Sequence, residues 1–218
     1  MNASERPVGR FAPEDSLVVI VDVQNDFCHP DGTMSGRGKD LSFVHEAVPK
    51  IQELIAAARE RDIPVVFVRT AHDDVLDSVV WRHRFQDGTG APYVPAEPNC
   101  VTDSWGAELY EIEPSPEEAV VTKSRYSAFS SPQFIETVAG IGRRSLFFAG
   151  VATNVCVESS ARDAVDHDYF ASIVSDASAA YREDEHSAAL SAFAEHFGRT
   201  VTVEELLGRW DAESAAAG

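Results

Sequence analysis

The strongest constraint on the fold is a set of short, almost wholly apolar runs that alternate with helical patterns. Residues 17–21 read Leu-Val-Val-Ile-Val, residues 64–68 Pro-Val-Val-Phe-Val and residues 145–149 Ser-Leu-Phe-Phe-Ala. A strand that is apolar along its whole length is covered on both faces, which is typical of parallel sheets between helices. Such strands alternating with helices predict an α/β fold, a mainly parallel sheet with a helical layer on each face.

The same patterns predict the order of elements along one domain, residues 1–218. Expected strands cover 17–21, 64–68, 119–121, 145–149, 169–174 and 200–203. Expected helices cover 43–62, 132–141, 154–167 and 183–197, with a short helix after the last strand. We expect Ser42 to cap the first long helix, residues 1–14 to form a loose N-terminal arm, and the tail 212–218 to fray.

Composition limits the partners and the compartment. The chain has 18 basic and 36 acidic residues, a net charge of −18, which argues against nucleic acid or an anionic membrane as a partner. It also disfavours a highly anionic substrate, unless the pocket is locally basic. Three cysteines without framework spacing, no apolar signal segment in residues 1–16 and no apolar run of about 18 residues favour a cytoplasmic protein.

Three chemically reactive side chains stand at or just past the carboxyl ends of expected strands: Asp22, Lys123 and Cys156. In a parallel sheet these ends share one edge, so the three can meet there. A carboxylate beside a cysteine can take its proton, and a lysine beside both would lower the pKa of each. The three residues therefore form a candidate catalytic group.

Each of these residues also has a simpler interpretation. Asp22 could cap a turn, Lys123 could be a solvated residue at a strand end, and Cys156 could be a small buried apolar residue. Cys156, however, follows a strand and a tight turn and opens a helix, where free N–H groups and the helix dipole favour a thiolate. The same N–H groups could hold an oxyanion.

Three longer motifs carry a resemblance to a known family. They are Val-Ile-Val-Asp-Val-Gln-Asn-Asp-Phe (19–27), Lys-Ser-Arg-Tyr-Ser-Ala-Phe (123–129) and Gly-Val-Ala-Thr-Asn-Val-Cys-Val-Glu-Ser-Ser-Ala-Arg-Asp-Ala (150–164). From about Leu17 to about Phe197 the chain resembles the isochorismatase-like cysteine hydrolases. These include nicotinamidases, N-carbamoylsarcosine amidase, ureidoacrylate amidohydrolase and biuret hydrolase, and the motifs look most like the ureido and carbamoyl branch.

The resemblance implies a doubly wound fold with a six-stranded sheet and a catalytic triad of Asp22 as base, Lys123 as positioning charge and Cys156 as nucleophile. It implies a cis peptide at Val151–Ala152 and an oxyanion hole made by the N–H groups of Ala152 and Cys156. The implied reaction is hydrolysis of a small amide or ureido compound through a Cys156 thioester, without a cofactor. The family also implies a homodimer or homotetramer.

Other members of the family supply alternative functions. Nicotinamidases carry an Asp-x-His-x-x-x-His metal site after the second strand, whereas this chain has only His72 in that region, so we predict no metal. Isochorismatases that cleave a vinyl ether lack the cysteine that is present here. A non-catalytic member would have lost Asp22, Lys123 or Cys156, and all three are retained.

Candidate substrate-binding residues lie close to the motifs. We predict that Gln24 and Arg125 contact polar groups of the substrate, and that Phe27 and Tyr126 wall the pocket, with Trp105 as a further wall residue. The simpler interpretations are a turn cap for Gln24, an ion pair for Arg125 and core packing for the aromatic residues. Specificity is expected to depend on the loops 28–40 and 71–106.

Overall fold

The computed structural model of the chain describes residues 10–84 and 98–217, so most of the expected arm 1–14 and part of the loop 71–106 lie outside it. Its sheet contains six strands that all pair in parallel, in the order β3-β2-β1-β4-β5-β6. The doubly wound α/β fold is confirmed. The strands are β1 (Ser16–Val21), β2 (Val65–Thr70), β3 (Ala119–Lys123), β4 (Ser145–Val151), β5 (Phe170–Ala179) and β6 (Arg199–Val201).

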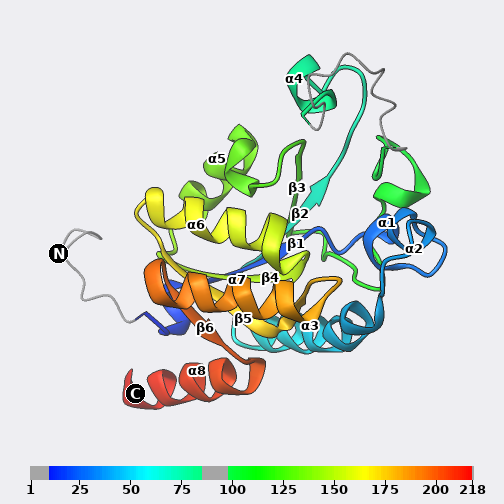
Figure 1. Cartoon of the computed structure of the whole chain (residues 1–218). Helices are drawn as coiled ribbons and strands as arrows, with labels where there is room; N and C mark the ends of the chain where they lie inside the picture. The colour runs from blue at the N-terminus through cyan, green and yellow to red at the C-terminus, as the bar shows by residue number, and fades with distance from the viewer. Residues whose placement is uncertain (1–9, 85–97, 218) are drawn as a thin grey trace.

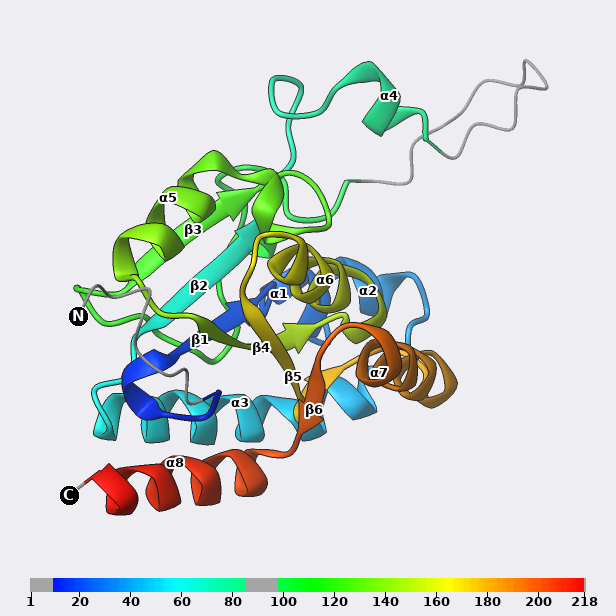
Figure 2. The ribbon, with the colours of Figure 1, turned by 90° about the vertical axis from the view of Figure 1, so that its left-hand side faces the viewer.

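Helices cover both faces of this sheet, giving three layers (Figure 1). The helices are α1 (Asn25–Cys28), α2 (Thr33–Gly36), α3 (Ser42–Glu60), α4 (Val79–Arg82), α5 (Pro132–Ile141), α6 (Glu158–Asp166), α7 (Glu183–His196) and α8 (Val203–Ala217). Figure 2 shows α3 and α8 on one face and α5, α6 and α7 on the other, with α4 standing out beyond the ends of β2 and β3. None of the helices in the described ranges is long and apolar enough to cross a membrane.

Alternation of side chains along β1 explains the two cores. Val18 and Ile20 pack with α3 and with Trp210 of α8, whereas Leu17 and Val19 pack with α5, α6 and α7. Successive residues of a strand point to opposite faces, so a strand between two helical layers must be apolar throughout. The uninterrupted apolar run in the sequence is the consequence.

Several element boundaries differ from expectation for identifiable reasons. Ser42 is the first residue of α3 and its side chain does not cap the helix, contrary to expectation. Instead, the Ser42 N–H donates to the Asp40 carboxylate at 2.9 Å. Helix α8 is long rather than short and runs through Ala217, so the predicted frayed tail is helical in this structure. The tail contains four alanines among residues 212–217, and alanine has the highest helix propensity.

At the centre of the sheet, between β1 and β4, the order in which the strands are added reverses. There Gly150 has φ of 128°, and a Cβ at this position would lie 2.0 Å from the Val21 carbonyl oxygen. Only glycine permits this approach and this backbone conformation. The reversal places the ends of β1 and β4 side by side, which is the position where open α/β sheets bind their ligands.

Candidate active site

An ion pair at the carboxyl ends of three strands forms the floor of the site. Lys123 Nζ, at the end of β3, lies 2.7 Å from Asp22 Oδ2, just past β1, and both side chains are fully buried. Thr70, the last residue of β2, completes this group: Lys123 Nζ donates to its hydroxyl at 2.6 Å, and the hydroxyl lies 3.1 Å from Asp22 Oδ1. We call Asp22, Thr70 and Lys123 the site floor.

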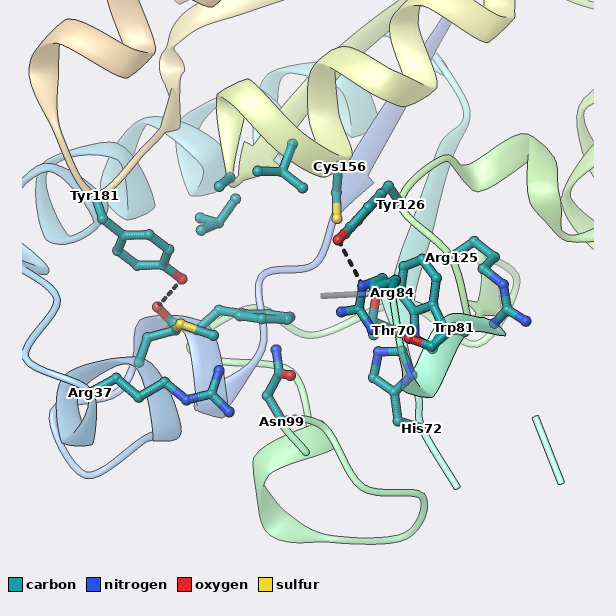
Figure 3. Close-up of a pocket in the computed structure, with 15 residues that line it drawn as sticks. Arg37, Thr70, His72, Trp81, Arg84, Asn99, Arg125, Tyr126, Cys156 and Tyr181 are labelled. Atoms are coloured by element: carbon teal, nitrogen blue, oxygen red, sulfur yellow. Dashed lines mark hydrogen bonds between the residues drawn. The ribbon is translucent and has the colours of Figure 1, made fainter. Parts of the chain in front are cut away.

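Cys156 lies next to the floor and, together with Thr70, lines a cavity. Its side chain interacts with both Asp22 and Lys123, and it lines a cavity of about 210 Å³. The three side chains that the sequence placed at one edge of the sheet are therefore in mutual contact. Figure 3 shows the Cys156 sulfur directed into the cavity.

The charge state of the thiol differs from expectation. Burial, followed by the negative charge of Asp22, raises the pKa of Cys156 above its ordinary value, while Lys123 acts in the opposite direction. Lys123 thus acts on this pKa in the predicted direction, but burial and Asp22 outweigh it, so the expected net lowering of the Cys156 pKa is not found. Burial, the largest single influence, opposes the charge of Lys123, but the interactions with Asp22 and Cys156 together outweigh it and raise the pKa of Lys123. The resting site thus holds a neutral thiol above a charged pair.

The backbone around Cys156 has the predicted cis peptide at Val151–Ala152. Cys156 lies in a π-turn, Thr153–Val157, rather than in the first turn of a regular α-helix, and α6 begins directly after it. The Ala152 carbonyl accepts from the N–H groups of Val155 and Val157 at 3.1 and 3.2 Å. Single π-turns of this kind are frequent at functional sites.

Polar residues of the 150–164 motif hold the π-turn in place. Ser160 Oγ donates to the Cys156 carbonyl at 2.7 Å and accepts from the Ala128 N–H at 2.9 Å. Thr153 Oγ1 lies 2.8 Å from His186 Nδ1 of α7. Residues of the motif on both sides of Cys156 therefore connect its backbone to two neighbouring segments, the one at Ala128 and helix α7.

The family model described as Isochorismatase domain matches residues 16–205, a range that contains the site floor, the π-turn and the cis peptide. This chain belongs to the isochorismatase family. The family predicted from the three sequence motifs is confirmed.

Known proteins similar to this isochorismatase-family chain include several named ureidoacrylate amidohydrolase RutB. The one from Variovorax paradoxus is 34% identical over 178 residues, 75% of this chain and 68% of its own. The one from Pseudomonas syringae pv. syringae is 32% identical over 205 residues, 90% of this chain and 84% of its own. A solved cysteine hydrolase from Pseudomonas syringae pv. phaseolicola has the same fold, with a TM-score of 0.79, 24% identity and coverage of 96% of this chain and 99% of its own.

Around the cavity, four residues from outside the sheet form a wall that we call the rim: Trp81 of α4 and the loop residues Arg84, Arg125 and Tyr126. The Trp81 ring is its centre, with the Arg84 guanidinium 3.9 Å and the Arg125 guanidinium 4.8 Å from the ring centroid. Tyr126 meets Trp81 edge-on at 4.8 Å, and its hydroxyl accepts from Arg84 Nε at 3.2 Å. Figure 3 shows these side chains together on one side of the cavity.

Three of the four predicted substrate-binding residues line the cavity, namely Phe27, Arg125 and Tyr126. Arg125 is also bound to its surroundings: its Nη1 donates to the Ser124 carbonyl at 2.6 Å and lies 3.6 Å from the Asp77 carboxylate. Trp105 does not line the cavity, and its ring packs against His29 instead. Trp81 has the role that was expected of Trp105.

The structure places Gln24 behind the floor and not in the cavity. Its amide is fully buried and bonded to backbone: Nε2 donates to the carbonyls of Thr70 and Ala107 at 2.9 and 2.8 Å, and Oε1 accepts from the Thr70 N–H at 2.7 Å. The prediction that Gln24 contacts the substrate therefore fails, because every hydrogen-bonding atom of the amide is used by the fold.

The neighbouring residues of the 19–27 motif also bind backbone. Asn25 Nδ2 donates to the Trp105 carbonyl at 2.8 Å, and Asp26 Oδ2 accepts from the Cys100 N–H at 2.6 Å. Both contacts reach the end of the loop 71–106. The motif therefore fastens that loop beside the site, which a reading of the sequence for substrate contacts does not reveal.

His72 lines the cavity, and its Nδ1 lies 2.9 Å from Asp77 Oδ1. Within residues 10–84 and 98–217, no group of three or more His, Cys, Asp or Glu side chains is arranged to hold a metal ion. His72 is thus engaged with the loop that carries Trp81.

Sequence reasoning missed several residues of the site, above all Thr70, Trp81, Arg84 and Tyr181. The second strand was expected to end at residue 68, but β2 continues to Thr70, whose backbone is held by Gln24. A signal was present: like Asp22 and Lys123, Thr70 is a polar residue that ends a run of strand residues. Trp81 and Arg84 gave no such signal, because Trp81 lies in the four-residue helix α4 and Arg84 just after it, in a stretch whose sequence has no regular pattern.

Proposed function

We propose that this chain is a cysteine-dependent amidohydrolase that cleaves a C–N amide or ureido bond of a small molecule through a Cys156 thioester. The observation that carries the proposal is the position of Cys156, which lines a cavity on one side and contacts the buried Asp22–Lys123 pair on the other. Membership of the isochorismatase family and the ureidoacrylate amidohydrolases among its relatives support the same reaction class.

The proposed reaction has two halves. Cys156 Sγ attacks the substrate carbonyl carbon while its proton passes to Asp22, which is needed because the resting thiol is neutral. The C–N bond then breaks as Asp22 returns the proton to the leaving ammonia or amine. Water hydrolyses the thioester, and in both halves the N–H groups of Ala152 and Cys156 hold the oxyanion.

The cavity favours a substrate that carries a carboxylate. Its described lining contains Arg37, Arg84 and Arg125 and no aspartate or glutamate, although the chain as a whole has a net charge of −18. A locally basic pocket in an acidic protein concentrates a small anion, and arginine binds a carboxylate with charge-assisted hydrogen bonds. Ureidoacrylate, N-carbamoylsarcosine and maleamate have this group, whereas biuret and nicotinamide are neutral.

The test is ammonia release from these five compounds, measured with the wild type, Cys156→Ala and the buried control Cys100→Ala. We expect kcat/KM for the preferred carboxylate to exceed that for the neutral compounds by about tenfold or more, since a hydrogen bond to a charged group contributes about 1.5–3 kcal/mol. Activity should vanish in Cys156→Ala and persist in Cys100→Ala.

The opposite outcomes are equally clear. Activity that survives Cys156→Ala would refute the thioester mechanism. A preference for biuret or nicotinamide would refute the anionic substrate, and inactivity on the whole panel would refute the substrate class.

Two expectations from the sequence stay predictions. We expect a homodimer or homotetramer, which light scattering after size-exclusion chromatography would measure. We also expect the protein in the cytoplasm, which fractionation of the source cells would test.

A further inference from the structure

The proposed catalytic triad consists of Asp22, Lys123 and Cys156, and it gives no role to the Thr70 hydroxyl, which also belongs to the site floor. Thr70 ends β2 and pairs in register with Lys123 of β3. Its side chain is only 4% exposed, yet it lines the cavity beside Cys156. It therefore contacts both the buried ion pair and the space where a substrate binds.

The chemistry of its two partners determines to which of them the Thr70 hydroxyl donates its hydrogen bond. A lysine ammonium only donates hydrogen bonds, so the Thr70 oxygen must accept from Lys123 Nζ at 2.6 Å. An ionised carboxylate only accepts, so the hydroxyl proton must go to Asp22 Oδ1 at 3.1 Å. Asp22 thus receives one hydrogen bond on each oxygen, from Thr70 on Oδ1 and from Lys123 on Oδ2.

The backbone of Thr70 is held separately from its side chain. Gln24 binds both the N–H and the carbonyl of Thr70, at 2.7 and 2.9 Å. A substitution at the hydroxyl therefore leaves this clamp in place, and the contribution of the hydroxyl can be measured by itself.

We propose that Thr70 is a positioning residue of the hydrolytic site, which orients the Asp22 carboxylate and keeps it charged so that it accepts the Cys156 proton. The inference rests on the proposed function. A donor to the charged form of an acid favours that form, so loss of the Thr70 hydroxyl raises the pH below which solvent protonates Asp22. It also removes the contact that orients Oδ1, so the carboxylate is less well placed to take the thiol proton. Among the described residues, five titratable groups interact electrostatically with Asp22. They are Lys123 of β3, Cys156 of the π-turn, Cys28 of α1, Cys100 and Tyr181.

The experiment compares Thr70→Val, which keeps the shape and removes the hydroxyl, with Thr70→Ser, which keeps the hydroxyl. Thr122→Val is the matched control, because Thr122 lies next to Lys123 on β3 and its hydroxyl binds Arg69 outside the site. For Thr70→Val we expect kcat to fall about 10- to 30-fold with KM within about threefold, and the acid limb of kcat/KM to move up by about half to one pH unit. Thr70→Ser should retain activity within about threefold and Thr122→Val should match the wild type.

A second readout does not depend on any amide substrate. Iodoacetamide alkylates Cys156: the S–C bond forms, the C–I bond breaks with loss of iodide, and the thiol proton passes to Asp22. Mass spectrometry of the peptide that contains Cys156 gives the rate at each pH. Thr70→Val should slow this alkylation about tenfold near neutral pH, and Thr70→Ser should not.

These two readouts separate the two proposals. If no amide is hydrolysed by the wild type but alkylation still depends on the Thr70 hydroxyl, the proposed function fails and the role of Thr70 stands. If Thr70→Val keeps the wild-type alkylation rate and acid limb, or if Thr70→Ser is as impaired as Thr70→Val, the positioning role is refuted. Should Thr70→Val fail to fold, Thr70→Ala takes its place with the same expectations.

Discussion

The floor and the rim of the site are built in different ways. Asp22, Thr70 and Lys123 come from the ends of three adjacent strands, so the hydrogen-bonded sheet determines their spacing. The rim residues Trp81, Arg84, Arg125 and Tyr126 come from α4 and from loops outside the sheet. Contacts between their rings and guanidinium groups hold them together. The groups that we propose to react are thus at the ends of sheet strands, whereas the residues proposed to contact the rest of a substrate are on connecting segments, which tolerate more variation.

The largest expected effect comes from breaking the floor. Asp22→Asn and Lys123→Met each leave an unpaired group in a fully buried position, which costs about 3–5 kcal/mol of stability. Each should also lower ammonia release by about 10³-fold or more, since the proton acceptor or its partner is lost. Urea unfolding and the steady-state assay measure the two losses.

The double variant Asp22→Asn with Lys123→Met is the control. Because it leaves no buried charge unpaired, its loss of stability should be well below the sum of the two single losses. Losses that add would show that the two side chains do not act as a pair.

A smaller effect is expected at the rim. Trp81→Ala removes the ring on which Arg84 and Arg125 stack, so KM should rise about tenfold while kcat stays within a few-fold. The matched control is Trp105→Ala, since Trp105 is 47% exposed and outside the cavity. Equal effects of the two substitutions, or a collapse of kcat in Trp81→Ala alone, would contradict the division between rim and floor.

The smallest effect concerns Cys28, a buried residue of α1 that belongs to neither the floor nor the rim. Burial raises the pKa of the Cys28 thiol from 9.0 to about 12. Between pH 9 and pH 12 the Cys28 thiol is deprotonated in the unfolded chain but protonated in the folded chain. Its contribution to the free energy of unfolding is therefore fully present below pH 9 and falls as the pH rises. One such thiol contributes at most about 1.4 kcal/mol per pH unit.

Urea unfolding at pH 8, 9 and 10 tests this slope. Cys28→Ala should lose less stability per pH unit than the wild type, in which all three buried thiols contribute. Parallel slopes for the two proteins would mean that water reaches Cys28.

Local sequence patterns predicted most of the fold because they record burial directly. The apolar runs at 17–21 and 145–149 are buried along their whole length, and both became central strands. Boundaries were less accurate where a distant contact decides them: β2 reaches Thr70 because Gln24, 46 residues earlier, binds its backbone.

The sequence by itself determined the parallel sheet, the family and the meeting of Asp22, Lys123 and Cys156, because strand ends in one sheet share an edge. Only the tertiary structure decided that Thr70 joins the ion pair, that Gln24 faces backbone and that Trp81 rather than Trp105 walls the cavity. It also decided that the Cys156 thiol is neutral at rest. These properties depend on the distances between segments that are remote in the sequence and on the loss of water around buried groups. A local sequence pattern determines neither the distances nor the desolvation.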